Sequence, residues 1–183
     1  INAHDISLSA KEIIDFDQLA AGATIGAFAT GAAVSVTTLQ PVVSAHTGSN
    51  VTFNGGGSVA LSSYLDQDHD VKTMSGVGSA FGDLGGSIIY LSDEGQSIAE
   101  TGASTKITGT GGVSITATSE RTSNLQALIG ALSGGTISGA VIYAKDSGIT
   151  KAATGTSAGI SAGDDSDILV KAGSVVSLIG KAV

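Results

Sequence analysis

The sequence predicts an all-β protein, folded as a right-handed parallel β-solenoid. Three observations lead to this prediction. A diverged segment of about 54 residues is present three times. Apolar and polar residues alternate over short stretches that are separated by Gly, Ser, Thr and Asn, a pattern typical of strands and turns. Two-residue hairpin signals and long helical patterns are nearly absent, which disfavours a meander of hairpins or a chain of βαβ units.

Each repeat contains the same three parts. A strand that begins with glycine lies at 31–36, 85–90 and 139–143. An Ala-x-Thr-Gly turn follows at 45–48, 99–102 and 152–155, and a closing strand at 58–62, 112–116 and 167–171. The spacing between matching positions is nearly constant, and the small gain in the third copy falls in a turn at 163–166. The repeats therefore span approximately 15–68, 69–122 and 123–177, and a repeat of this kind indicates one unit stacked on copies of itself.

A unit of this length divides into three coils of about 18 residues, which predicts roughly ten coils and a rod about 50 Å long. Aligned positions should then form ladders of like side chains along the rod. The expected inward columns are Val34, Ile88 and Val141; Val59, Val113 and Ile168; and Leu61, Ile115 and Val170. Tyr90 and Tyr143 align as ladder neighbours.

The length and composition favour one domain, and residues 1–183 are expected to be a single solenoid fragment of a longer chain. The net charge is −8 and the eight Lys and Arg are scattered. Nucleic acid and anionic membrane surfaces need clustered cations, so neither is expected as a partner. The absence of cysteine excludes disulfides and thiolate metal sites.

The uncharged run from Leu19 to Val36 raises the alternative of a membrane helix, because it contains spaced glycines. Its aligned copies argue against that alternative. The second copy contains Asp83 and the third is interrupted by Ser133-Gly134-Gly135. Membrane insertion is therefore disfavoured.

Two acidic segments are candidate calcium sites, since carboxylates at alternate positions offer the oxygen ligands that Ca²⁺ prefers. The candidate ligands are Asp66, Asp68, Asp70, Asp164, Asp165 and Asp167. The first segment begins like an EF-hand loop, but Val71 and Val77 replace the turn glycine and the bidentate carboxylate. Solvated acidic turns are the alternative interpretation, and no cofactor other than a weakly bound calcium is expected.

Carboxylate pairs offer the only catalytic hypothesis, glycoside hydrolysis, which needs two carboxylates held across a cleft. Asp15 with Asp17 and Asp93 with Glu94 are such pairs, but the sequence does not place them opposite each other. Tryptophan platforms are lacking, and the three histidines lie far apart, in segments interpreted as turns. Surface charge explains the acids better, and the chain is not expected to be an enzyme.

The repeat resembles those of large secreted bacterial exoproteins, the filamentous-haemagglutinin-like and leukotoxin-type filamentous adhesins of two-partner-secretion or autotransporter-like systems. The resemblance lies in the Gly-Ala-Ala-Val-Ser-Val strand at 31–36, the Ala-x-Thr-Gly turns, and the Gly-Gly-Val-Ser-Ile-Thr-Ala strand at 111–117. It covers most of residues 15–183 and offers no catalytic residues.

This resemblance implies a secreted or cell-surface segment that mediates attachment or acts as a rigid spacer. The implied partners are host-cell or extracellular-matrix proteins or glycans, and the remainder of the same long chain. A polysaccharide-processing β-helix enzyme and a membrane-active toxin segment are the alternatives.

Overall fold

The computed structural model describes residues 1–133 and 135–183, and over these residues the chain is all-β. The strands, in chain order, are β1 Asn2–Ala3, β2 Ile6–Leu39, β3 Val42–His46, β4 Thr52–Gly55, β5 Val59–Asp93, β6 Gln96–Glu100, β7 Lys106–Gly109, β8 Val113–Leu132, β9 Thr136–Asp146, β10 Ile149–Ala153, β11 Gly159–Ala162 and β12 Ile168–Ala182. Every strand pairing within the described residues is parallel.

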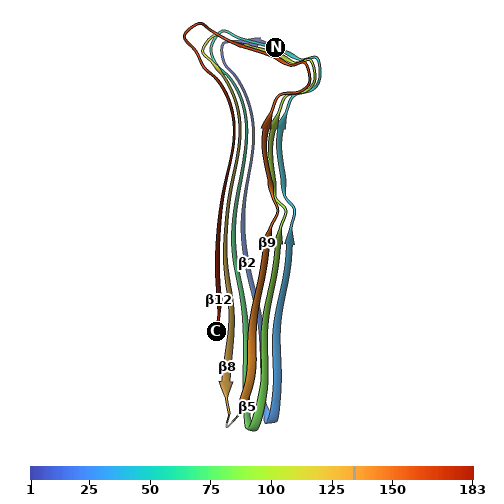
Figure 1. Ribbon diagram of the computed structural model, residues 1–183, viewed down its shortest axis with the longest axis vertical. Helices are drawn as coiled ribbons and strands as arrows, with labels where there is room; N and C mark the ends of the chain where they lie inside the picture. The colour runs from blue at the N-terminus through green and yellow to red at the C-terminus, as the bar shows by residue number, and fades with distance from the viewer. Residues whose placement is uncertain (134) are drawn as a thin grey trace.

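The longest strands, β2 and β5, run the length of the molecule, fold back and return (Figure 1). A register shift between Gly26 and Phe28 marks this bend in β2. We call segments 6–26, 59–78, 113–132 and 168–182 the outgoing sheet, and segments 28–39, 82–93 and 136–146 the return sheet. Two small sheets, β3–β6–β10 and β1–β4–β7–β11, close each coil at the opposite end.

Paired residues lie one whole repeat apart in the sequence. Ile6 pairs with Val59, Val59 with Val113, and Val113 with Ile168. Parallel stacking in register with the sequence repeat is thus confirmed, but the division of each repeat into three short coils is wrong. One repeat makes one coil, so the described chain forms three coils and begins a fourth with β12, not roughly ten.

The shape differs from the expected rod for the same reason. At about 3.3 Å per residue the outgoing sheet is roughly 65 Å long, whereas four strands stacked about 4.8 Å apart are under about 20 Å thick. Figure 1, viewed down the shortest axis, shows the strands running along the longest axis. The molecule is a thin slab, two sheets wide, rather than a rod elongated along the stacking direction.

The inner faces of the two sheets and of the closing coils enclose the core. One apolar cluster lies between the outgoing and return sheets, and two lie at the closing end. Their buried members are, respectively, Val71, Ile89, Leu91, Leu125 and Ala127; Ile6, Phe53, Val59, Ile107 and Val113; and Ala45, Leu61, Ala99, Ile115 and Ala117.

The predicted ladders have the correct register, but not all of them face inward. Val59 and Val113, and beside them Leu61 and Ile115, are buried as predicted. Their fourth-coil partners Ile168 and Val170 are exposed because β12 is an edge strand.

The column of Val34, Ile88 and Val141 is a wrong prediction: these side chains are 53%, 44% and 55% exposed. The inward positions of the return sheet instead include Ser35 and Thr37, whose hydroxyls donate to Gln18 Oε1 across the core at 2.7 and 2.6 Å. The alignment of Tyr90 with Tyr143 is confirmed. The two rings are stacked, with centroids 5.2 Å apart and planes 7° apart.

The Ala-x-Thr-Gly turn is stacked from coil to coil by its threonine. The Gly102 N–H donates to Thr47 Oγ1, and the Gly155 N–H donates to Thr101 Oγ1, both at 2.9 Å. A Cβ on Gly102 would collide with the backbone of Gly48 in the coil below. Glycine is required here because the coils approach each other too closely for any side chain.

Candidate functional site

The outer face of the outgoing sheet carries the first acidic segment. Asp66, Asp68 and Asp70 occupy alternate positions of β5 and point outward, while the residues between them point into the core. The acidic turn expected at 66–70 is therefore wrong, because the segment lies within a continuous strand. A strand whose inward residues are Gln67 and His69 does not show the usual alternation of apolar and polar residues.

The register adds further acids to this face. Asp15 lies beside Asp68, Asp17 beside Asp70, and Asp66 beside Glu120. Lys72 forms an ion pair with Asp70 at 2.9 Å. We call these six carboxylates (Asp15, Asp17, Asp66, Asp68, Asp70 and Glu120) the acidic ladder.

The second acidic segment does form a turn, as the sequence predicted. Asp164 and Asp165 are exposed in the connection between β11 and β12, and Asp167 precedes β12. Throughout the part of the chain that the structure describes, no three His, Asp or Glu side chains gather closely enough to hold a metal ion. Calcium binding by either segment stays a prediction.

Like charges directly opposite each other on adjacent strands destabilise a sheet. We expect Asp68→Asn, which removes the carboxylate facing Asp15, to raise the free energy of unfolding by about 0.5 kcal/mol. Millimolar Ca²⁺ should raise the melting temperature of the wild type more than that of the variant. Thermal unfolding with and without Ca²⁺ measures both effects. In the absence of Ca²⁺, Asp164→Asn, in the exposed turn, is the matched control for removal of one carboxylate. Equal melting temperatures for wild type and Asp68→Asn would contradict repulsion within the ladder.

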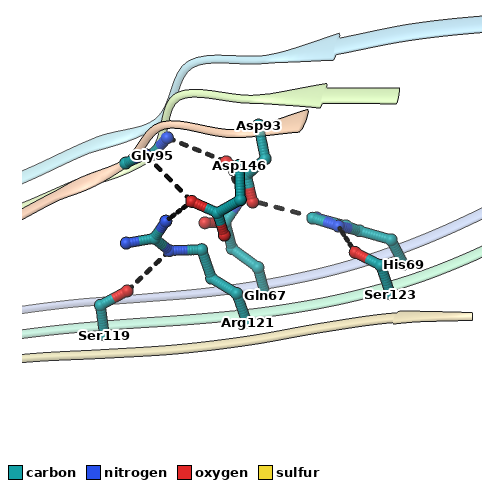
Figure 2. A network of polar contacts seen from close by, with 9 residues as sticks. Gln67, His69, Asp93, Gly95, Ser119, Arg121, Ser123 and Asp146 are labelled. Carbon is teal, nitrogen blue, oxygen red and sulfur yellow. Dashed lines mark hydrogen bonds and ion pairs between the residues drawn. The ribbon is translucent and has the colours of Figure 1, made fainter. Parts of the chain in front are cut away.

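A second cluster of polar groups lies inside the slab, where the outgoing sheet faces the turns that end β5 and β9 (Figure 2). Arg121 is 3% exposed, forms an ion pair with Asp146, and donates from Nε to Ser119 Oγ at 2.8 Å. Asp93, one coil below Asp146, accepts from the Gln67 amide at 3.4 Å. We call Gln67, His69, Asp93, Arg121 and Asp146 the interior polar network.

Two glycines make room for this network. The Gly95 N–H donates to Asp93 Oδ1 at 2.8 Å, and the Gly148 N–H donates to Asp146 Oδ1 at 3.0 Å. A Cβ on Gly95 would collide with Gln67 Oε1, and one on Gly148 would collide with the Arg121 guanidinium. The same turn thus orients a carboxylate inward in the second and third coils.

Within this network His69 is fully buried and lies in β5, although the sequence interpretation placed it in a turn. Its Nδ1 lies 3.2 Å from Ser123 Oγ, and its Nε2 lies 3.5 Å from Gln67 Nε2. Because Gln67 Nε2 can only donate, the geometry fits a neutral ring that is protonated on Nδ1. Burial lowers the pKa of His69, and the charges of Asp93, Asp68 and Asp146 oppose that shift.

The lowered pKa of His69 makes stability depend on pH. Above about pH 6.5 the ring is neutral in both the folded and the unfolded state, whereas at lower pH the unfolded state binds a proton first. Stability is therefore expected to decrease as the pH falls from about 6.5 towards the folded-state pKa.

His69→Phe should remove this component of the pH dependence, because phenylalanine has no titratable group. The position should accept the ring, since Phe16 occupies the same position one coil below. Melting temperatures between pH 7.5 and 5.5 measure it. His46→Gln, at an exposed position, should keep the wild-type profile. An unchanged profile in His69→Phe would assign the pH dependence to other groups.

The two carboxylate pairs considered for catalysis do not share a surface. Asp15 and Asp17 lie outside on the outgoing sheet, whereas Asp93 is buried and hydrogen-bonded inside. The structure brings Asp15 and Asp17 next to Asp68 and Asp70 instead. These two pairs are one repeat apart, so their alignment was visible in the sequence and could have revealed the acidic ladder.

The described residues include no helix long and apolar enough to cross a membrane. Comparison with known proteins found no matching family model, no matching curated protein and no matching solved structure.

Proposed function

We propose that the chain is a structural and adhesive segment of a bacterial secreted or surface-displayed exoprotein, in which stacked coils act as a stiff spacer for attachment. The main observation in support of this proposal is the continuity of the parallel ladders. β2 and β5 stay in register from Ile6–Val59 to Leu39–Asp93 with one shift, and β12 pairs with β8 over its whole length. Such ladders support a rigid, quasi-one-dimensional assembly. The right-handed sense predicted from the sequence is part of this proposal.

The open edges support stacking with further coils, and hence the remainder of the same long chain as a partner. Among the described residues the outer edges of β2 and β12 are unpaired, and edge strands of this length are usually covered or charged. β12 carries only Lys171 and Lys181 as charged residues and exposes many apolar side chains. A covering coil would bury these side chains and pair the edge groups.

A host-cell or extracellular-matrix protein or glycan is the proposed external partner. Stacked coils present related outer faces side by side, so weak contacts made by successive coils would add up to higher avidity. The acidic ladder repels phosphate backbones, which argues against nucleic acid.

The test is binding of the labelled protein to immobilised matrix proteins, glycans and host cells, with the secondary structure verified by circular dichroism. Saturable binding that strengthens at least tenfold when two copies are linked in tandem supports the adhesive role. A variant neutralised at Asp15, Asp17, Asp68 and Asp70 shows whether the acidic ladder contributes. A β-rich protein that binds none of these surfaces would overturn adhesion and leave the spacer role, which single-molecule stretching measures directly.

A further inference from the structure

The outer face of the return sheet is apolar and nearly free of charge. Its outward positions form five rows across β2, β5 and β9. The rows are Thr30, Leu84 and Ile137; Ala32, Gly86 and Gly139; Val34, Ile88 and Val141; Val36, Tyr90 and Tyr143; and Thr38, Ser92 and Lys145. Lys145 is the single charged residue among them.

Large apolar side chains on this face are substantially exposed. Eight of them are between 38% and 74% exposed: Val34, Val36, Leu84, Ile88, Tyr90, Ile137, Val141 and Tyr143. Together they present on the order of 800 Å² of surface, more than the largest patch of a typical monomer and close to what each partner contributes to a standard interface. Parallel sheets are normally covered on both faces, so this face lacks a covering layer.

The relief of the face is self-complementary. The row of Ala32, Gly86 and Gly139 is a trough, because a Cβ built on Gly86 or Gly139 meets no atom within 4 Å. A hollow of about 400 Å³ at this row is lined by Thr30, Gly31, Ala32, Leu84, Gly85 and Gly86. The neighbouring row, with Leu84 and Ile137, is a ridge. A two-fold rotation can place the ridge of one copy in the trough of another.

The charge distribution favours self-association on this side. The chain carries a net charge of −8, and the acidic ladder lies on the outer face of the outgoing sheet, on the opposite side of the slab. Two copies that meet through their return sheets keep these ladders apart. Copies that meet through the outgoing sheets would bring the ladders together.

We propose that the outer face of the return sheet is the interface of a two-fold symmetric dimer, in which the Leu84 and Ile137 ridge of each copy packs into the Gly86 and Gly139 trough of the other. The two return sheets would then pack face to face about 10 Å apart, as in a β-sandwich. The occupant of this face is a second copy of the chain.

Sedimentation velocity and light scattering on the protein between about 1 and 100 µM test this proposal. Gly86→Val fills the trough without a clash in the monomer, and Ile137→Lys places a charge on the ridge. Both are expected to weaken dimerisation at least tenfold. Met74→Lys, at an exposed position on the outgoing sheet, is the matched control and should dimerise like the wild type.

Circular dichroism separates loss of the interface from loss of the fold, because all three variants should keep the wild-type spectrum. A wild type that stays monomeric throughout this range overturns the proposal. Open-ended oligomers whose formation is unaffected by Gly86→Val and Ile137→Lys would assign association to the open strand edges. That result would also overturn the proposal. If the protein remains monomeric and a glycan binds to this face, the glycan is the occupant, and the proposal of a second copy is overturned.

Discussion

Asp146→Leu is expected to lower the free energy of unfolding by about 3 kcal/mol, whereas the double variant Arg121→Ile/Asp146→Leu should unfold with wild-type stability or higher. In the single variant the Arg121 guanidinium stays buried and, among the described residues, keeps only the Ser119 hydroxyl as a hydrogen-bond partner. A buried charge without a counter-charge is costly. In the double variant both charges are absent. The attraction between them is lost, but so is the free-energy cost of removing both charges from water, which is of similar size.

The chain supplies its own precedent for the double variant. In the first coil, Ile14 occupies the register position of Arg121, and Leu39 occupies that of Asp146. The apolar pair is therefore compatible with the same backbone. We therefore expect the interior polar network to have a small effect on stability when it is replaced as a unit.

Chemical denaturation of the wild type, both single variants and the double variant forms a complete double-mutant cycle. Arg121→Ile should be less harmful than Asp146→Leu, since the Asp146 carboxylate is partly exposed and keeps the Gly148 N–H as a donor. Additive effects of the two substitutions would contradict a direct charge pair.

The parallel stacking could be predicted from the sequence, because most residues are stacked on their counterparts in the next repeat. The sequence distance between matching positions is nearly constant, as in the pairs 113 and 168, 59 and 113, and 34 and 88. These residues are also paired in the sheets, so the repeat length specifies the register directly. The circumference of a coil could not be predicted in the same way. The repeat length is equally compatible with three small coils and with one large coil, and the bend at Gly26 resembles the many other glycines.

The inward and outward faces were predicted from hydrophobicity, and this criterion fails where inward polar groups bond to one another. Ser35, Thr37 and Gln18 satisfy each other inside the slab, so apolar side chains are not needed there. Gln67 and Arg121 occupy the same position in successive coils, but one is an amide and the other a cation. An alignment of the repeats therefore shows no recurring polar residue at this position. The interior polar network depends on contacts between the two sheets, which a repeat alignment does not contain.

Ile89→Ala is expected to lower the free energy of unfolding by about 2–5 kcal/mol, whereas Ile88→Ala should change it by about 1 kcal/mol or less. The two residues are adjacent and identical, but they occupy opposite faces of β5. Ile89 is 0% exposed, in the core cluster with Val71 and Leu125, whereas Ile88 points outward and is nearly half exposed. Truncating Ile89 leaves a cavity in the core, and truncating Ile88 does not.

Urea denaturation of both variants at sub-micromolar concentration, where copies are separated, measures the difference directly. Val141→Ala, in the next coil above Ile88, should behave like Ile88→Ala and serves as the matched control. The inward column expected from the sequence would give the opposite order, with Ile88→Ala and Val141→Ala the harmful variants. This comparison therefore decides between the two facings of the return sheet without any knowledge of what the protein binds.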